Sequence, residues 1–165
     1  MNGKRVLMLS GAVLAAGFAS AFGEGSAAAV GDKLRDEGRL EEALAAYRKA
    51  GSVATGAARG ELTVRQALVQ DVLGKLEAAR ELLGQAKKDN PALATLEEAR
   101  LSMEYPPFDP APAVAALQAA VKSAPADAAL QVALGNALVN AGKFDEAGPA
   151  FEQVLQKLDP KSLPA

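Results

Sequence analysis

Apolar residues recur along this chain with the spacing of amphipathic α-helices. Ala43, Tyr47 and Ala50, for example, are four and three positions apart, with charged residues between them. Residues at such intervals share one face of a helix, so this face can be buried while the charged face meets water. The same spacing predicts helices over 26–37, 40–51, 59–72, 75–89, 92–104, 110–123, 127–140 and 144–158.

This helical pattern repeats with a period of about 34 residues. A small residue, a large apolar residue four positions later and a further apolar residue occur together four times, at intervals of 36, 34 and 34 residues. The three series are Ala43, Ala79, Ala113 and Ala147; Tyr47, Leu83, Leu117 and Phe151; and Ala50, Ala86, Ala120 and Val154. The small residues let neighbouring helices approach closely, and the large residue fills the space between them. Since one helix pair alone cannot bury its apolar face, the pairs are expected to stack into a continuous core.

Glycine and proline mark the ends of the predicted helices. Gly38, Gly74 and Gly142 precede the second helix of three units, where a tight turn favours a residue with access to positive φ. The third unit has the proline-rich turn 105–112 in place of this glycine. Prolines that stop a second helix close the last three units, at Pro91, Pro125 and Pro160.

Residues of these types at this period resemble the tetratricopeptide repeat. The pair Leu134–Gly135 matches the small-residue crossing point of the family's first helix, and the resemblance spans about residues 26–160. It implies an all-α fold, a right-handed α-solenoid of about four antiparallel helix-turn-helix repeats, whose first helices line a concave side. The predicted division is a domain over 24–160, with repeats at about 24–57, 60–91, 92–125 and 126–160, and a short tail over 161–165.

Residues 1–21 have the layout of a secretory signal peptide. Lys4 and Arg5 precede an uncharged run of 18 residues from Val6, and a small-x-small pattern ends at Ala21. We expect cleavage after Ala21, with a second candidate site within 26–29. The alternative is an uncleaved membrane anchor, although 18 residues are few against the ~20 that a spanning helix needs. The expected location is therefore the bacterial periplasm or the outside, or else the inner membrane through a retained anchor.

The composition excludes several classes of function. The chain has no cysteine and no histidine, which excludes disulfides, thiol catalysis, Ser-His-Asp triads and the usual zinc sites. Since no phosphate-binding loop or metal-ligand spacing is present either, we expect no catalytic residue, no cofactor and no metal, and a protein that is not an enzyme. Without Lys4 and Arg5, 16 basic and 20 acidic residues give a net charge of −4, and no basic patch favours nucleic acid as a partner.

Polar residues on the first helices, directed away from the core stripe, are the candidate partner-binding residues. The predicted concave-side set is Asp32, Arg35, Asp36, Arg65, Asn136 and Asn140. The amides of Asn136 and Asn140, four positions apart, both donate and accept hydrogen bonds and could hold a peptide backbone. The alternative is an ordinary solvated helix surface. Tyr105 and Phe108, in the proline-rich turn, are a second candidate, either as exposed interface anchors or as rings folded back onto neighbouring helices.

The repeat, the export signal and the missing catalytic side chains together indicate a binding protein. We expect an exported adaptor or assembly factor that holds a peptide or helix of another protein in its concave groove. The alternative is a structural role, as a self-associating protein or as a membrane-anchored subunit of a larger envelope complex. No polar capping helix is visible after Pro160, so the outer face of the last helix could dock onto a partner or a second copy.

Replacement of Ala79 or Ala147 with leucine tests the repeat register. Both alanines occupy predicted helix crossings, so a leucine should overpack the interface and lower the free energy of unfolding by about 1–3 kcal/mol. Urea unfolding followed by circular dichroism measures this change. Unchanged stability in both variants would contradict the register.

Overall fold

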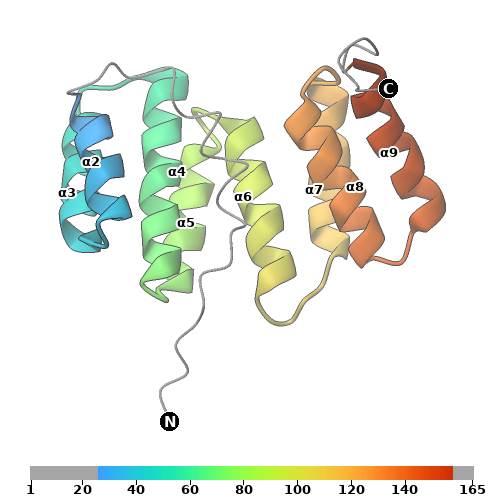
Figure 1. Cartoon of the computed structure of the whole chain (residues 1–165), viewed down its shortest axis with the longest axis horizontal. Helices are drawn as coiled ribbons and strands as arrows, with labels where there is room; N and C mark the ends of the chain where they lie inside the picture. Colours follow the sequence, from blue (N-terminus) through green and yellow to red (C-terminus); the bar gives the residue numbers. More distant parts are fainter. Residues whose placement is uncertain (1–25, 158–165) are drawn as a thin grey trace, which may run out of the picture.

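The computed structural model describes residues 26–157, and within this range every regular element is an α-helix (Figure 1). The helices are, in chain order, α2 (Ala27–Asp36), α3 (Leu40–Gly51), α4 (Gly56–Val72), α5 (Leu76–Ala86), α6 (Pro91–Glu104), α7 (Ala111–Ser123), α8 (Ala128–Asn140) and α9 (Phe144–Lys157). The all-α prediction is confirmed. The largest differences from the predicted bounds are at α4, which begins at 56 rather than 59, and at α5, which ends at 86 rather than 89. The predicted signal peptide over 1–21 and the tail over 161–165 lie outside the described residues.

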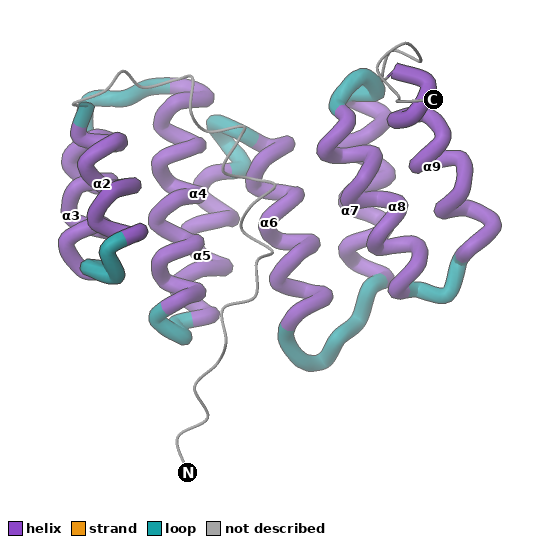
Figure 2. Tube along the Cα trace, in the orientation of Figure 1, coloured by secondary structure: helices purple, strands orange, loops and turns teal. Residues whose placement is uncertain are grey.

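The described helices form antiparallel pairs that lie side by side along the molecule (Figure 2). α4 also packs against α6, and α6 against α8, whereas no two of the second helices α3, α5, α7 and α9 make a comparable contact. Because neighbouring elements are closest on the inner side of a curved stack, the first helices α2, α4, α6 and α8 form its inner layer. We call the surface of these first helices that is turned away from the second helices the inner face.

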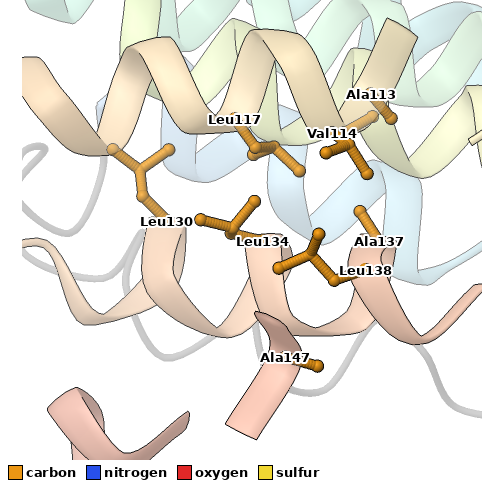
Figure 3. Packing of buried hydrophobic residues seen from close by; sticks show 9 residues of the cluster. Ala113, Val114, Leu117, Leu130, Leu134, Ala137, Leu138 and Ala147 are labelled. Carbon is orange, nitrogen blue, oxygen red and sulfur yellow. The ribbon is translucent and has the colours of Figure 1, made fainter. Parts of the chain in front are cut away.

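Three clusters of buried apolar side chains run through the stack. One joins α2, α3 and α4, the next joins α4, α5 and α6, and the third joins α6 to α9. In the third cluster, Leu117 of α7 and Leu130 and Leu138 of α8 are at most 2% exposed. Ala147 brings α9 against them (Figure 3). Since α4 and α6 each contribute to two clusters, the burial of one pair depends on its neighbours.

The two helices of the first pair, and those of the last pair, meet at a glycine. An added Cβ at Gly31 would lie 2.5 Å from Cε1 of Tyr47, and one at Gly135 would lie 2.5 Å from Cζ of Phe151. The two glycines occupy the same repeat position, 104 residues apart. Glycine is needed there because the aromatic ring of the second helix takes the space that a side chain of the first helix would fill.

Three of the turns within pairs share one structure. Gly38, Gly74 and Gly142 have φ values of 77°, 73° and 72°. The residue after each glycine donates its N–H to the carbonyl five positions earlier, at 2.8 Å, which closes the helix end. The turn of the third pair has no glycine. Phe108 has a φ of 56° there, and its N–H donates to the carbonyl of Tyr105 at 3.1 Å.

Side chains accept hydrogen bonds from N–H groups at the start of several helices, α2 and α7 among them. Oγ of Ser26 accepts a hydrogen bond from the N–H of Ala29 at 3.1 Å, so Ser26 is the N-cap of α2. The start of α7 is shifted by one residue from the prediction. Pro110 takes the cap position rather than the first helical position, and Oδ1 of Asp109 accepts from the N–H of Ala111 at 3.0 Å.

Gly135→Ala should lower the free energy of unfolding by about 1–3 kcal/mol, because the new Cβ displaces the ring of Phe151. Gly84→Ala in α5 is the matched control, since no atom lies within 4 Å of its Cβ position. It should raise the free energy of unfolding by roughly 0.5–1 kcal/mol through the lower conformational entropy of the unfolded chain. Denaturant unfolding measures both changes, and shifts in the same direction would contradict the crossing.

Candidate functional site

Four of the sequence-predicted residues, Asp32, Arg35, Asp36 and Arg65, are joined in one ion-pair network on the inner layer. Asp32 of α2 accepts a hydrogen bond from the Tyr47 hydroxyl at 2.7 Å and pairs with the guanidinium of Arg65 in α4. Arg65 also pairs with Glu61 at 2.6 Å. A nitrogen of Arg35 lies 3.5 Å from Oδ1 of Asp32. The Arg65 side chain, which the sequence places on an open surface, is only 2% exposed and connects α2 to α4.

Burial affects two members of this network, Tyr47 and Arg65. Burial and the hydrogen bond to Asp32 raise the pKa of Tyr47, so its hydroxyl stays protonated and continues to donate. A buried guanidinium is tolerated when carboxylates compensate its charge, and Arg65 has two of them. Asp36, the remaining candidate on α2, is 69% exposed and accepts from Arg35 at 2.9 Å. The charges at this end of the inner face therefore compensate one another within the chain.

A second network, which the sequence analysis does not predict, connects α4 to α6. Arg100 lies at its centre and pairs with Asp71 and Glu97, at 2.8 Å each. Glu104 is its third partner, and the Tyr105 hydroxyl donates to Asp71 at 2.6 Å. The Glu97 side chain is 1% exposed, and burial, opposed by Arg100, raises its pKa. The sequence contains one sign of this network. Asp71 and Tyr105 are polar residues 34 positions apart, so they occupy the same position in successive repeats.

The proline-rich turn separates the two aromatic candidates. Tyr105 is partly buried, packs against the cluster that joins α4, α5 and α6, and donates to Asp71. Phe108 is 59% exposed and has a positive φ, a conformation that costs an L-residue roughly 1–2 kcal/mol. The ring of Tyr105 is therefore packed into the fold, and the ring of Phe108 faces solvent.

The two asparagine candidates lie on the exposed side of α8. Asn136 and Asn140 are both exposed, and Val132 and Val139 are 36% and 42% exposed. Residues at these spacings share one helix face, and we call the four of them the α8 surface. Nδ2 of Asn140 lies 3.2 Å from Sδ of Met103 on α6. Within residues 26–157, the side-chain amide of Asn136 makes no hydrogen bond.

Neither a metal centre nor a membrane span is found in the described part of the chain. Residues 26–157 contain no cluster of three or more carboxylate, histidine or cysteine side chains that could hold a metal ion. None of the helices α2 to α9 combines the length and the apolar character needed to cross a membrane. The inner face thus offers ion pairs over α2 to α6, and amides with valines over α8.

Arg65→Ala should lower the free energy of unfolding by about 3 kcal/mol. This is the lower end of what breaking a buried ion pair costs, because Asp32 keeps contact with water. Arg59→Ala is the matched control: Arg59 is 50% exposed and pairs with Asp89 at 2.7 Å. This exposed pair should contribute under about 1 kcal/mol. Urea unfolding of both variants separates the two roles, and equal losses would show that the Arg65 network does not stabilise the stack.

Comparisons with known proteins agree with this architecture. A family model described as tetratricopeptide repeat matches residues 128–161. Among solved structures, a crystal structure of MamA is similar with a TM-score of 0.61 at 20% identity, covering 82% of this chain and 78% of that chain. A structure of MamA AMB-1 gives a TM-score of 0.54 at 22% identity, covering 81% of this chain and 72% of that chain. No curated protein sequence matches the chain.

The two kinds of match cover different lengths of the chain. The family model covers the last helix pair, and the structural similarity extends over about four fifths of the chain. At 20–22% identity, the structural similarity establishes the fold alone. Residues 128–161 therefore match the tetratricopeptide repeat, and residues 26–157 fold as an α-helical solenoid of stacked helix pairs.

Proposed function

We propose that this protein is an exported adaptor or assembly factor that binds a segment of a partner protein on its inner face, centred on the α8 surface. The tetratricopeptide repeat and the solenoid fold support a role in protein interaction or assembly. A fold of this kind does not specify its ligand, so the site must come from particular side chains. The observation that carries the site is the exposure of two amides and two valines on one face of α8.

The α8 surface differs from the equivalent positions of the first repeat. Asn136 occupies the repeat position of Asp32, and Asn140 occupies that of Asp36. In α2 both positions are carboxylates bound to arginines of the same chain. In α8 they are amides, and Asn136 makes no side-chain hydrogen bond within residues 26–157. The Asn136 amide is therefore available to a partner, and Asn140 is held within the chain by a contact of its Nδ2 with the sulfur of Met103, whereas both carboxylates of α2 are paired with arginines.

The chemistry of the α8 surface suits a peptide segment. Each amide offers a donor and an acceptor, which match the two polar groups of a peptide unit. Val132 and Val139 are seven positions apart, so they lie about 10 Å apart along the helix. An amphipathic helix or extended segment can place apolar side chains on the valines and polar groups on the amides. Burial of the valine surface would then contribute about 25 cal/mol for each Å² removed from water.

Export would determine where the partner is met. The predicted signal peptide, residues 1–21, would deliver the mature chain to the periplasm or the outside, and its retention would anchor the solenoid to the inner membrane. Both routes leave the partner among envelope or external proteins. The N-terminal peptide of the protein recovered from its host distinguishes them, because cleavage after Ala21 leaves Phe22 as the first residue.

Asn136→Ala combined with Asn140→Ala should weaken capture of the partner at least tenfold, because each lost hydrogen bond leaves a peptide group unpaired. The measurement is affinity capture of the tagged protein from its native host, with quantitative mass spectrometry of the proteins recovered. Both asparagines are exposed, so the free energy of unfolding should change by less than about 0.5 kcal/mol.

Gln85→Ala is the matched control, since it removes an exposed amide from the outer helix α5. It should leave the recovered partner unchanged. Equal recovery with the double asparagine variant would remove the α8 surface from the proposal. Recovery of the tagged protein alone, in repeated experiments, would count against an adaptor.

A further inference from the structure

The network around Arg100 carries more negative than positive charge. Each of the three guanidinium nitrogens of Arg100 donates to a different carboxylate: Asp71 of α4, Glu97 or Glu104. The Tyr105 hydroxyl donates to Asp71 as well. Within residues 26–157, no second cation pairs with these carboxylates, so one positive and three negative charges give a net charge of −2. We call this contact between the second and third pairs the α4–α6 junction.

The Arg65 network between α2 and α4 is closer to balance. Arg35 and Arg65 supply two positive charges to the three carboxylates Asp32, Asp36 and Glu61, which leaves a net charge of −1. The Asp36 side chain is 69% exposed, so water solvates much of the negative charge. The α4–α6 junction therefore has both the larger excess of charge and, as Glu97 shows, the deeper burial.

Glu97 is a carboxylate in a position where the other first helices have none. Its side chain is 1% exposed. The same repeat position holds Ala27 in α2, Thr63 in α4 and Gln131 in α8. Gln131 is 2% exposed and donates to Gln153 of α9 at 2.8 Å. The repeat thus accepts a buried neutral amide here, and the third pair alone places an ionisable group at the position.

The helices around Glu97 offer no further compensating charge. Helix α8 has no charged residue, the charged residues of α5 are exposed, and so is Lys122, the single charged residue of α7. Burial raises the pKa of Glu97 above its ordinary value, although Arg100 opposes the rise, and the negative charges of Glu104 and Asp71 add to it. The geometry and the charge count thus agree that Glu97 is costly to ionise in the folded chain.

We propose that the α4–α6 junction is stabilised by acid, because protonation of Glu97 removes part of its excess negative charge and lets α6 pack more firmly against α4. The ionised Glu97 shares one guanidinium with Asp71 and Glu104 and is repelled by both. The protonated side chain still accepts a hydrogen bond from Arg100 through its carbonyl oxygen. The junction lies between the first two pairs and the α8 surface, and it does not depend on a ligand at that surface.

The pH dependence of stability has a definite sign. Glu97 binds its proton more tightly in the folded chain than in the unfolded chain, whose glutamates have a pKa of about 4.3. Folding therefore takes up a proton between these two pKa values. Ionised Glu97 lowers the stability of the fold at neutral pH. This loss is relieved as the pH falls through the pKa of the folded state, and the gain is complete near the pKa of the unfolded state.

Urea unfolding of the full chain and of Glu97→Gln, from about pH 8 to about pH 4.5, tests the proposal. The glutamine imitates the protonated acid and matches Gln131 of the next repeat. The folded-to-unfolded ratio of the natural chain, divided by that of the variant, should rise as the pH falls. Glu98→Gln is the matched control, since Glu98 is the next residue of α6 and pairs with Lys87 rather than with Arg100. Measured against this control, the natural chain should show no such rise.

Hydrogen exchange shows whether the effect is local. Protection factors of amides in α4 and α6 should increase on acidification in the natural chain and stay constant in Glu97→Gln. A ratio that stays level or falls with falling pH would overturn the proposal, as would an equal rise against both variants. The carboxyl carbon chemical shift of Glu97 provides a test that needs no variant, because a titration at or below the ordinary glutamate pKa would also overturn it.

Discussion

The close approach of the two helices within a pair is the constraint on which the rest of the stack depends. In the first and last pairs, Gly31 and Gly135 leave room for an aromatic ring of the second helix. In the two middle pairs the same position is Ala67 and Leu101, and the second helix offers leucine in place of the ring. The volume at each crossing is thus divided between the two helices. This division allows the two helices of each pair to pack closely.

The contacts between pairs differ along the chain although the repeat is the same. The first three pairs are joined by arginines, because the buried Arg65 connects α4 to α2 and the partly buried Arg100 connects α6 to α4. The fourth pair joins the third through the apolar cluster around Leu117 and Leu130. A buried ion pair is stable only with a partner of opposite charge at the right position, whereas an apolar contact depends mainly on the volume of its side chains. Specificity within the fold is therefore concentrated over α2 to α6, and surface left for a ligand is concentrated at α8.

Periodic features were predictable from the sequence because they depend on the spacing of residues alone. The helix bounds, the glycine turns at Gly38, Gly74 and Gly142, and the crossing at Gly135 all follow from positions that recur at the repeat length. A cap such as Ser26 is likewise local, since its side chain bonds a backbone group three residues on. Each of these features is determined within one helix pair.

Features that depend on a neighbouring pair were not predictable in the same way. The sequence shows Arg65 as a charge on a first helix, but the carboxylates that allow its burial come from two different helices. Tyr105 and Phe108 share one turn, and only the position of Asp71 on α4 determines that Tyr105 is held by a hydrogen bond. The composition of a turn does not encode that position. Side chains at the junction between pairs thus require the three-dimensional register.

The unequal junctions also govern how the length of such a chain can change during evolution. A helix pair inserted between the first and third pairs would separate Arg65 from Asp32, or Arg100 from Asp71, and leave buried charges unmatched. Duplication of the fourth pair would preserve both arginine contacts, because its junction with the third pair is apolar. Descendants of this chain with more repeats are thus expected to have gained them after α7, with the first three pairs inherited as one block.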